Sequence, residues 1–345
     1  MINVALLGAG IFAREEHLPA IEAADNLKLV AVYSRSSKSV DSLAEVAKNP
    51  VDKYYETPKE AGKSLDDLLS RNDIQAVIVA LPIISQPEVV EKALAAGKHV
   101  LSEKPVAPDV AGAKALISWY RSINQPPIWA VAENFRYVKS LKFAHDKVKE
   151  LGGKLVTFHM RMYNYVTKDN KYFNTSWRKQ PEHQGGFLLD GGVHFAAGLR
   201  LLLGALGEDV KYLAAFSALL QPELLPVDTI HSTVSTATGA AGTIILSNGI
   251  EFKSGLEIEI VTTNGIVNWN PSEVKVTRKG VQDESTKFSR DTGVAAEVAA
   301  FGKSVEAKEA DPLQTPEEAL ADLRILQALL KSGEAGGALK VIADV

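Results

Sequence analysis

The sequence predicts a two-domain protein of class α/β plus α+β: an N-terminal Rossmann domain with a doubly wound parallel sheet, then a C-terminal domain with an open-faced, mostly antiparallel β-sheet. Three observations carry this prediction. A glycine turn follows the first apolar run, at residues 8–13. Apolar runs then alternate with helical patterns as far as Ala132, as expected for parallel strands buried on both faces. After Asn134, β-rich segments separated by turn residues dominate.

The first domain is placed at residues 1–132, where five short apolar runs are typical of buried strands. These expected strands are residues 4–7, 29–33, 76–81, 99–101 and 128–132. Helical patterns lie between them, including residues 64–69 and 88–96. The second of these helices is expected to end at Gly97, a residue type common at helix C-caps.

The second domain is placed at residues 133–345. Its expected strands are residues 155–163, 210–220, 229–237, 242–246, 256–261 and 274–277. Turn dipeptides such as Asn248-Gly249 separate several of them. Two helices, at about residues 186–203 and 315–332, complete the domain, and the last helix can pack back on the first domain. Apolar runs such as residues 243–246 need cover if the sheet is open on one face, which predicts a homodimer or homotetramer.

Composition limits the classes of function. The chain has 345 residues, 46% of them hydrophobic, which suffices for two cores. A net charge of -4 provides no field for polyanions, so no nucleic-acid partner is expected. There is no uninterrupted apolar run of membrane-spanning length and no leader before the glycine turn, so we expect no membrane association and a cytoplasmic location. Cysteine is absent, and no metal site is predicted.

The glycine turn matches the G-x-G-x-x-G/A pattern of dinucleotide-binding domains, between a strand and a helix as that pattern requires. Gly8 permits the tight turn, and Gly10 lets the backbone approach a pyrophosphate. Ala13 allows close helix packing. The helix N-terminus then offers N–H groups to the phosphates, so we expect Ile11 and Phe12 to join the two glycines in binding the cofactor. The alternative is a tight turn without a ligand.

The end of the second strand carries Ser34-Arg35-Ser36, with Lys38 just beyond. An NAD-selective protein places an acid there to hold the ribose 2′-hydroxyl. An arginine fork and serine hydroxyls instead suit a 2′-phosphate. The cofactor is therefore predicted to be NADP(H), and the alternative is a solvated basic turn.

Two further segments end at the carboxyl edge of the predicted sheet, where open α/β folds bind ligands. One carries Leu81 and Pro82, and the other carries Glu103 and Lys104. We expect all four residues to contribute to the cofactor site. Pro105 restricts the backbone of Lys104, which fits a positioned side chain, although a lone lysine on a loop is usually a solvated charge.

A third segment, residues 185–194, places Asp190 and His194 four positions apart. On a helix these side chains share one face. Gly191 and Gly192 each weaken such a helix by roughly 1 kcal/mol, which suggests that something approaches its backbone closely. The alternative is an ordinary Asp–His pair on a helix surface.

Together, the glycine turn, Glu103-Lys104-Pro105 and the Asp-x-Gly-x-His pattern at residues 190–194 resemble the glucose-fructose oxidoreductase, inositol dehydrogenase and rhizopine catabolism (Gfo/Idh/MocA) family. Residues 315–320 are similar to that family's last helix. The resemblance covers essentially the whole chain. It implies an NAD(P)-dependent oxidoreductase, with a nucleotide-binding domain and an open-faced sheet domain often used for dimer or tetramer contacts.

The resemblance also implies roles for three residues. Lys104 would bind the reacting oxygen, His194 would act as acid and base, and Asp190 would orient the substrate or the catalytic pair. These roles suit hydride transfer between a nicotinamide and a hydroxyl or carbonyl carbon, because a proton must leave or join the same oxygen. The expected substrate is a small sugar, polyol, aldehyde or dicarbonyl.

Further residues resemble the family's substrate side: Asn134, Arg136, Trp177 and Arg178. For each of them, ordinary packing or a salt bridge is the alternative. Many family members carry an acid shortly after the histidine, whereas this chain has Phe195-Ala196-Ala197-Gly198. The remaining histidines match no motif and are expected to be structural or solvated: His17, His99, His145, His159, His183 and His231.

Two other functions are compatible with the fold. One is a non-catalytic regulatory protein that senses NADP, and the other is redox-neutral glycoside cleavage with a tightly held nicotinamide. The presence of Lys104, Asp190 and His194 together favours an enzyme over a sensor, because sensing requires the cofactor pocket alone. Release and exchange of the cofactor would separate a dehydrogenase from the redox-neutral enzyme.

Overall fold

A computed structural model describes residues 1–342 of the chain. The chain divides into two compact units. The first comprises Met1–Asn134 and Val294–Leu320, and the second comprises Phe135–Gly293 and the segment from Ala321 onward. The predicted fold class is confirmed in both units, because the first holds a parallel sheet and the second a mostly antiparallel one.

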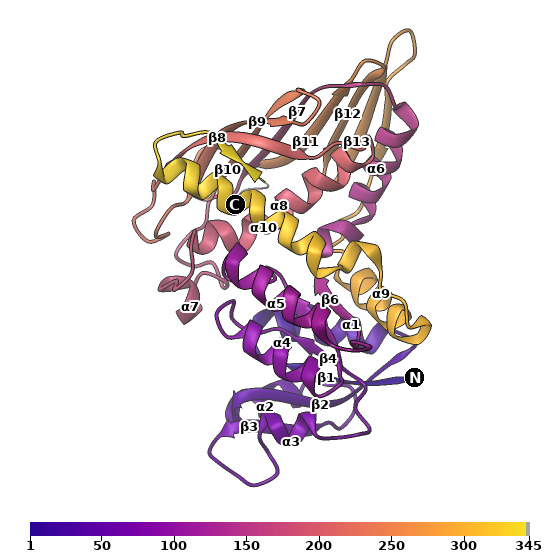
Figure 1. Ribbon diagram of the computed structural model, residues 1–345, viewed down its shortest axis with the longest axis vertical. Helices are drawn as coiled ribbons and strands as arrows, with labels where there is room; N and C mark the ends of the chain where they lie inside the picture. The colour runs from indigo at the N-terminus through magenta and orange to yellow at the C-terminus, as the bar shows by residue number, and fades with distance from the viewer. Residues whose placement is uncertain (343–345) are drawn as a thin grey trace. The chain divides into compact units, whose positions relative to one another are not determined.

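The first unit is built on six parallel strands in the order β3-β2-β1-β4-β5-β6 (Figure 1). Their bounds are β1 Ile2–Leu7, β2 Leu27–Ser36, β3 Asp52–Thr57, β4 Ala76–Val79, β5 His99–Glu103 and β6 Trp129–Ala132. The strand order reverses between β1 and β4. In open α/β sheets, ligands bind outside the carboxyl ends of the strands at such a reversal.

Helices cover this sheet, as its fully buried strand residues require. They are η1 Ala13–His17, α1 Leu18–Ala23, α2 Ser37–Ala44, α3 Leu65–Leu69, α4 Gln86–Ala95, α5 Val110–Ser122, α9 Val294–Ala307 and η3 Pro312–Gln314. Val4 and Leu6 of β1 share one apolar core with residues of α1, α2 and α9. Gly97 has a φ of 75°, and its N–H donates to the Leu94 carbonyl, as the predicted C-cap requires.

The second unit is built on nine strands in the order β14-β13-β12-β11-β7-β10-β9-β8-β15. Only β7 and β10 pair in parallel among these strands. The bounds are β7 Leu155–Tyr163, β8 Val210–Ala218, β9 Thr229–Thr236, β10 Ala241–Ser247, β11 Gly255–Thr262, β12 Gly265–Asn270, β13 Glu273–Arg278, β14 Glu284–Lys287 and β15 Lys340–Val341.

Two long helices pack on one face of this sheet. Helix α6, Lys139–Leu151, contacts β12 and β13, and helix α8, Gly186–Gly204, contacts β7, β10 and β11. Phe158 and Met160 of β7 are fully buried on the covered face, whereas the alternate residues Thr157 and His159 are partly exposed. This alternation is typical of a sheet with one covered face.

The sequence-based prediction of helices after residue 133 was incomplete. It gave two helices, whereas α6 and α9 are also present, as are the short helices η2 Asn134–Tyr137 and α7 Ser176–Lys179. Helix α6 buries Leu141, Ala144 and Val148, which follow a helical period, but the lysines between them obscure that pattern. Helix α10, Pro316–Glu334, belongs to the first unit up to Leu320 and to the second unit from Ala321.

Helix α8 is long and apolar enough to cross a membrane by length and composition. About two thirds of its apolar window, 67%, is buried inside the protein, which is also the pattern of a core helix. No other helix in residues 1–342 meets the same criteria.

Candidate active site

The glycine turn joins three strand ends of the first unit. The Gly8 N–H donates to the Tyr33 carbonyl at 2.8 Å, and Gly8 has a φ of 123°. A Cβ atom at Gly8 would lie 2.2 Å from the Ala80 carbonyl oxygen, whereas a Cβ at Gly10 would have no atom within 4 Å. Gly8 is therefore required by the fold itself, while Gly10 leaves space open beside the turn.

This difference predicts different effects of two alanine substitutions. Gly8→Ala is expected to lower the free energy of unfolding by about 1–3 kcal/mol, because it strains the backbone and clashes with Ala80. Gly10→Ala is expected to change that free energy by less than about 0.5 kcal/mol, as in most open positions, and to weaken dinucleotide binding. Denaturant unfolding and cofactor titration measure the two effects. A Gly10→Ala variant with unaltered cofactor affinity would contradict the prediction that the pyrophosphate lies against the backbone at Gly10.

The helix after the turn begins at Ile11 and passes through a π-helical turn, η1, which the sequence did not predict. Ala13 is 1% exposed, as close helix packing requires. The ring of Phe12 makes an edge-to-face contact with His17, with 5.3 Å between centroids. Open space beside Gly10 and a helix N-terminus directly after it fit a bound dinucleotide phosphate.

The end of β2 presents basic groups to solvent. Arg35 and Lys38 are exposed, and Ser34 is partly exposed. Ser36 has a structural role as the N-cap of α2, since its Oγ accepts a hydrogen bond from the Ser39 N–H at 3.3 Å. Just before them, burial and the neighbouring Glu56 carboxylate raise the pKa of Tyr33. The exposed positive charge at this strand end comes from Arg35 and Lys38.

The segment with Lys104 follows β5 at the carboxyl edge of the same sheet. Lys104 is partly exposed, and its bond to Pro105 is cis. Glu103 contacts buried His17 with 2.7 Å between Oε1 and Nε2. The Leu81 and Pro82 pair follows β4 and is also partly exposed. The predicted cofactor residues of the first unit thus collect at the carboxyl ends of β1, β2, β4 and β5.

In the second unit, Asp190 forms an ion pair with Arg178, with 2.7 Å between Oδ2 and Nε. The two side chains are 9% and 16% exposed. The Arg178 guanidinium lies over the Trp177 ring, 4.0 Å from its centroid. Asp190 and the adjacent pair Trp177 and Arg178, which the sequence singled out separately, therefore form one cluster, and a planar guanidinium on an indole ring is a rigid arrangement.

His194 lies one turn after Asp190 on α8 and is partly exposed. Its ring stacks on Phe135, with 5.0 Å between centroids and 17° between planes. This stacking limits rotation of the imidazole. Nothing in the sequence pointed to Phe135, because its motif neighbours Asn134 and Arg136 are the polar residues.

The helix glycines are explained mainly by packing. A Cβ at Gly192 would lie 2.7 Å from Cδ1 of Leu326 on α10, and a Cβ at Gly186 would lie 2.3 Å from the Leu225 carbonyl oxygen. The close approach that the sequence suggested is therefore real, but at Gly192 a leucine makes it. Gly191 has no atom within 4 Å of its Cβ position and leaves space open.

Other predicted residues have structural surroundings. Arg136 is 2% exposed and pairs with buried Asp322, which also binds Arg200 at 3.0 Å. Arg136 therefore forms a salt bridge, which was the alternative to a substrate contact. Asn134 begins η2 and is partly exposed. Within residues 1–342, no three His, Cys, Asp or Glu side chains form a group that could hold a metal ion.

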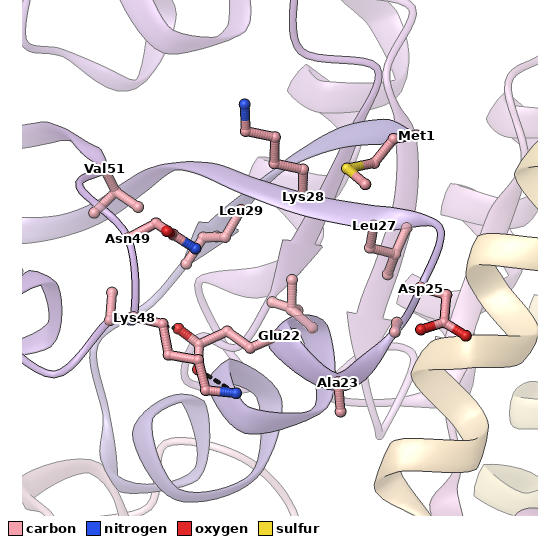
Figure 2. Close-up of a pocket in the computed structure, with 13 residues that line it drawn as sticks. Met1, Glu22, Ala23, Asp25, Leu27, Lys28, Leu29, Lys48, Asn49 and Val51 are labelled. Atoms are coloured by element: carbon pink, nitrogen blue, oxygen red, sulfur yellow. Dashed lines mark hydrogen bonds and ion pairs between the residues drawn. The ribbon is translucent and has the colours of Figure 1, made fainter.

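A hollow of about 430 Å³ opens at the opposite edge of the first sheet, near the amino ends of β1 and β2 (Figure 2). Glu22 crosses part of it, accepting a hydrogen bond from the Lys48 N–H at 2.6 Å. None of the predicted cofactor residues lines this hollow. The hollow therefore lies away from the carboxyl ends of the strands, where the cofactor is expected to bind.

Comparison with known proteins identifies the family. Residues 2–125 match the model of an oxidoreductase family with an NAD-binding Rossmann fold, and residues 150–341 match the C-terminal alpha/beta domain of the same Gfo/Idh/MocA family. The chain belongs to this family. It is an oxidoreductase with a domain for a nicotinamide cofactor.

Three relatives illustrate the similarity. A dehydrogenase of Fusarium mangiferae, FPY6, is 51% identical over 99% of both chains. The dTDP-3,4-didehydro-2,6-dideoxy-alpha-D-glucose 3-reductase of Saccharopolyspora spinosa is 28% identical over 89% of this chain and 88% of its own. The crystal structure of an oxidoreductase from Thermotoga maritima has a TM-score of 0.87 at 29% identity, covering 99% of both chains.

Proposed function

We propose that the protein is an NADP(H)-dependent oxidoreductase that moves a hydride between the nicotinamide and a hydroxyl or carbonyl carbon of a small polar substrate. One observation carries the proposal. The open glycine turn, the exposed Arg35 and the Lys104 segment all lie at the carboxyl ends of neighbouring strands β2, β1, β4 and β5. A dinucleotide and a cation for the reacting oxygen therefore belong to the same sheet edge.

The choice of NADP(H) over NAD(H) rests on Arg35, helped by Ser34 and Lys38. Arg35→Ala is expected to weaken NADPH binding by about 1.5–3 kcal/mol, as for loss of a hydrogen bond between charged groups, and to leave NADH binding unchanged. Lys28→Ala is a matched control, because Lys28 is exposed on the same strand at its other end. Fluorescence titration of both cofactors measures the effect. Equal losses for NADPH and NADH would refute the 2′-phosphate contact.

When bound, the nicotinamide supplies or accepts the hydride. Lys104 then binds the oxygen of the reacting carbon, and its ammonium stabilises negative charge that develops there. In the second unit, the His194 imidazole is the group proposed to give a proton to the substrate during reduction and to remove it during oxidation. Asp190, paired with Arg178, holds the substrate side of α8 in place, and Phe135 holds the imidazole plane.

The substrate class proposed is a sugar, polyol, aldehyde or dicarbonyl. The Saccharopolyspora spinosa relative is named as a reductase of a keto sugar, which supports carbonyl chemistry on a polar substrate. The test is nicotinamide absorbance with NADPH and a panel of aldoses, short aldehydes and diketones, and with NADP and polyols in reverse. Binding of NADPH without turnover in either direction would support a cofactor sensor instead.

We also propose assembly through the open face of the nine-stranded sheet. Ile245 on β10 and Phe216 on β8 both lie opposite His231 of β9 on this face, and Phe216 is 67% exposed. Such apolar side chains favour burial against another copy. Sedimentation at micromolar concentration is expected to show a homodimer or homotetramer, and Ile245→Lys to shift it toward monomer. Val281→Lys, at an exposed hairpin position, is the control. A monomeric wild type would refute this interface.

A further inference from the structure

The segment that carries Lys104 is attached to two buried polar side chains of the first unit, His17 and Gln86. We propose that His17 and Gln86 are positioning residues that fix the backbone of Lys104 relative to the glycine turn. The inference rests on the proposed function of Lys104. Neither residue belongs to a motif that the sequence identified as part of the site.

His17 connects the helix after the glycine turn to Glu103. Its side chain is 0% exposed, and its Nε2 lies 2.7 Å from Oε1 of Glu103, the residue immediately before Lys104. The Glu103 carboxylate is an acceptor, so Nε2 carries the proton and donates. Nδ1 of His17 is buried and has no hydrogen-bond partner. A buried histidine with a single polar contact indicates that this contact determines its orientation.

Gln86 contacts the backbone of the segment. It is the first residue of α4 and is 1% exposed. Its Nε2 donates to two carbonyl oxygens, that of Glu103 and that of Pro105, the latter at 3.2 Å. These two carbonyls flank Lys104 on either side. A single amide group therefore bridges the residue before the lysine and the residue after it.

The combined contacts explain how a long, flexible lysine side chain can act at a defined point. The lysine stem has several rotatable bonds, so the position of its ammonium depends on where its Cα is held. His17 connects η1, which follows Gly10, to the Glu103 side chain, and Gln86 connects α4, which follows Pro82, to the backbone on both sides of Lys104. Displacement of a reacting group by about 1 Å can lower a rate on the order of 10²-fold.

Hydrogen exchange of residues 102–107, followed by mass spectrometry on the full-length protein, tests the proposal without a substrate. His17→Leu and Gln86→Leu are each expected to speed exchange of this segment about tenfold or more, because each removes a contact that holds it closed. His17→Gln retains a donor toward Glu103 and is expected to keep exchange near the wild-type rate. It also keeps the test informative if His17→Leu does not fold.

Two matched controls use the same residue types in the same unit. Burial lowers the pKa of His99, which accepts a hydrogen bond from the Ile128 N–H at the amino end of β5. Gln75 accepts one from the Asn3 N–H at the amino end of β4. His99→Leu and Gln75→Leu are expected to leave exchange of residues 102–107 unchanged. Unaltered exchange in both test variants, or equal acceleration in the controls, would overturn the proposal.

A double-mutant cycle on turnover then separates positioning from general stability. His17→Leu is expected to lower kcat on the order of 10²-fold, with the NADPH Kd within a few-fold of wild type. In a Lys104→Met background it should have almost no further effect, because it acts through that lysine. Independent, multiplying losses would overturn the positioning role. Wild-type turnover by Lys104→Met alone would instead contradict the proposed function. The hydrogen-exchange result would still show whether His17 and Gln86 hold the segment that carries Lys104.

Discussion

Replacing Lys104 by methionine is expected to lower kcat about 10²- to 10³-fold while leaving the NADPH Kd within a few-fold of wild type. We propose that the ammonium stabilises the developing charge on the substrate oxygen, and removing one such donor has an effect of this size. Cofactor affinity is expected to be retained, because the proposed phosphate and ribose contacts come from the glycine turn and Arg35. Methionine preserves the length of the apolar stem and removes the charge.

The matched control for this variant is Lys92→Met, because Lys92 lies on the surface of α4 and pairs with Glu88 at 2.9 Å. That substitution is expected to leave kcat and Kd unchanged. Steady-state kinetics on a substrate found in the carbonyl panel, with cofactor titration of each variant, measures the contrast. Near-wild-type turnover by Lys104→Met would mean that the lysine has no role in catalysis, and would favour a regulatory protein.

His194→Asn is expected to reduce kcat by about 10²- to 10⁴-fold, the range for loss of a positioned acid or base. The dependence of the rate on pH should also change, because the substitution removes the group proposed to give and accept the proton. Asp190→Asn is expected to have a smaller effect, since the role proposed for Asp190 is orientation through its ion pair with Arg178.

The control for His194 is His145→Asn, a histidine on α6 that is 29% exposed and contacts Asp146 at the surface. It should leave both the rate and its pH profile unchanged. The measurement is kcat against pH for the wild type and the three variants. A His194→Asn enzyme with the full rate and the wild-type pH profile would assign the proton transfer to another group.

The sequence predicted the parts of the molecule in which one physical requirement dominates. The turn at Gly8 leaves little freedom, because its φ of 123° and the nearby Ala80 carbonyl exclude a side chain. Strands buried on both faces likewise appear as continuous apolar runs, as in residues 76–79. Helix α6 was missed, since its buried residues are separated by lysines that resemble a solvated loop.

The contacts within the candidate site could not be predicted in the same way, because they join residues far apart in the sequence. The pairing of Asp190 with Arg178 depends on how α7 folds beside α8, and no local pattern encodes it. His17 matched no motif and was expected to be structural or solvated; it is buried, and no local pattern encodes its contact with Glu103, 86 positions away. A histidine shortly after a dinucleotide-binding turn belongs to no known motif, so a comparison of motifs does not identify its contact with Glu103.

Deuterium transfer tests the central claim most directly. NADPH carrying deuterium at the nicotinamide C4, prepared separately for each face of the ring, would be incubated with the wild-type protein and a carbonyl substrate from the panel, and the alcohol product analysed by mass spectrometry. Direct hydride transfer predicts one deuterium on the new carbinol carbon from one of the two labelled cofactors and none from the other. A product without deuterium from either cofactor, or no product from any carbonyl with NADPH bound, would contradict it.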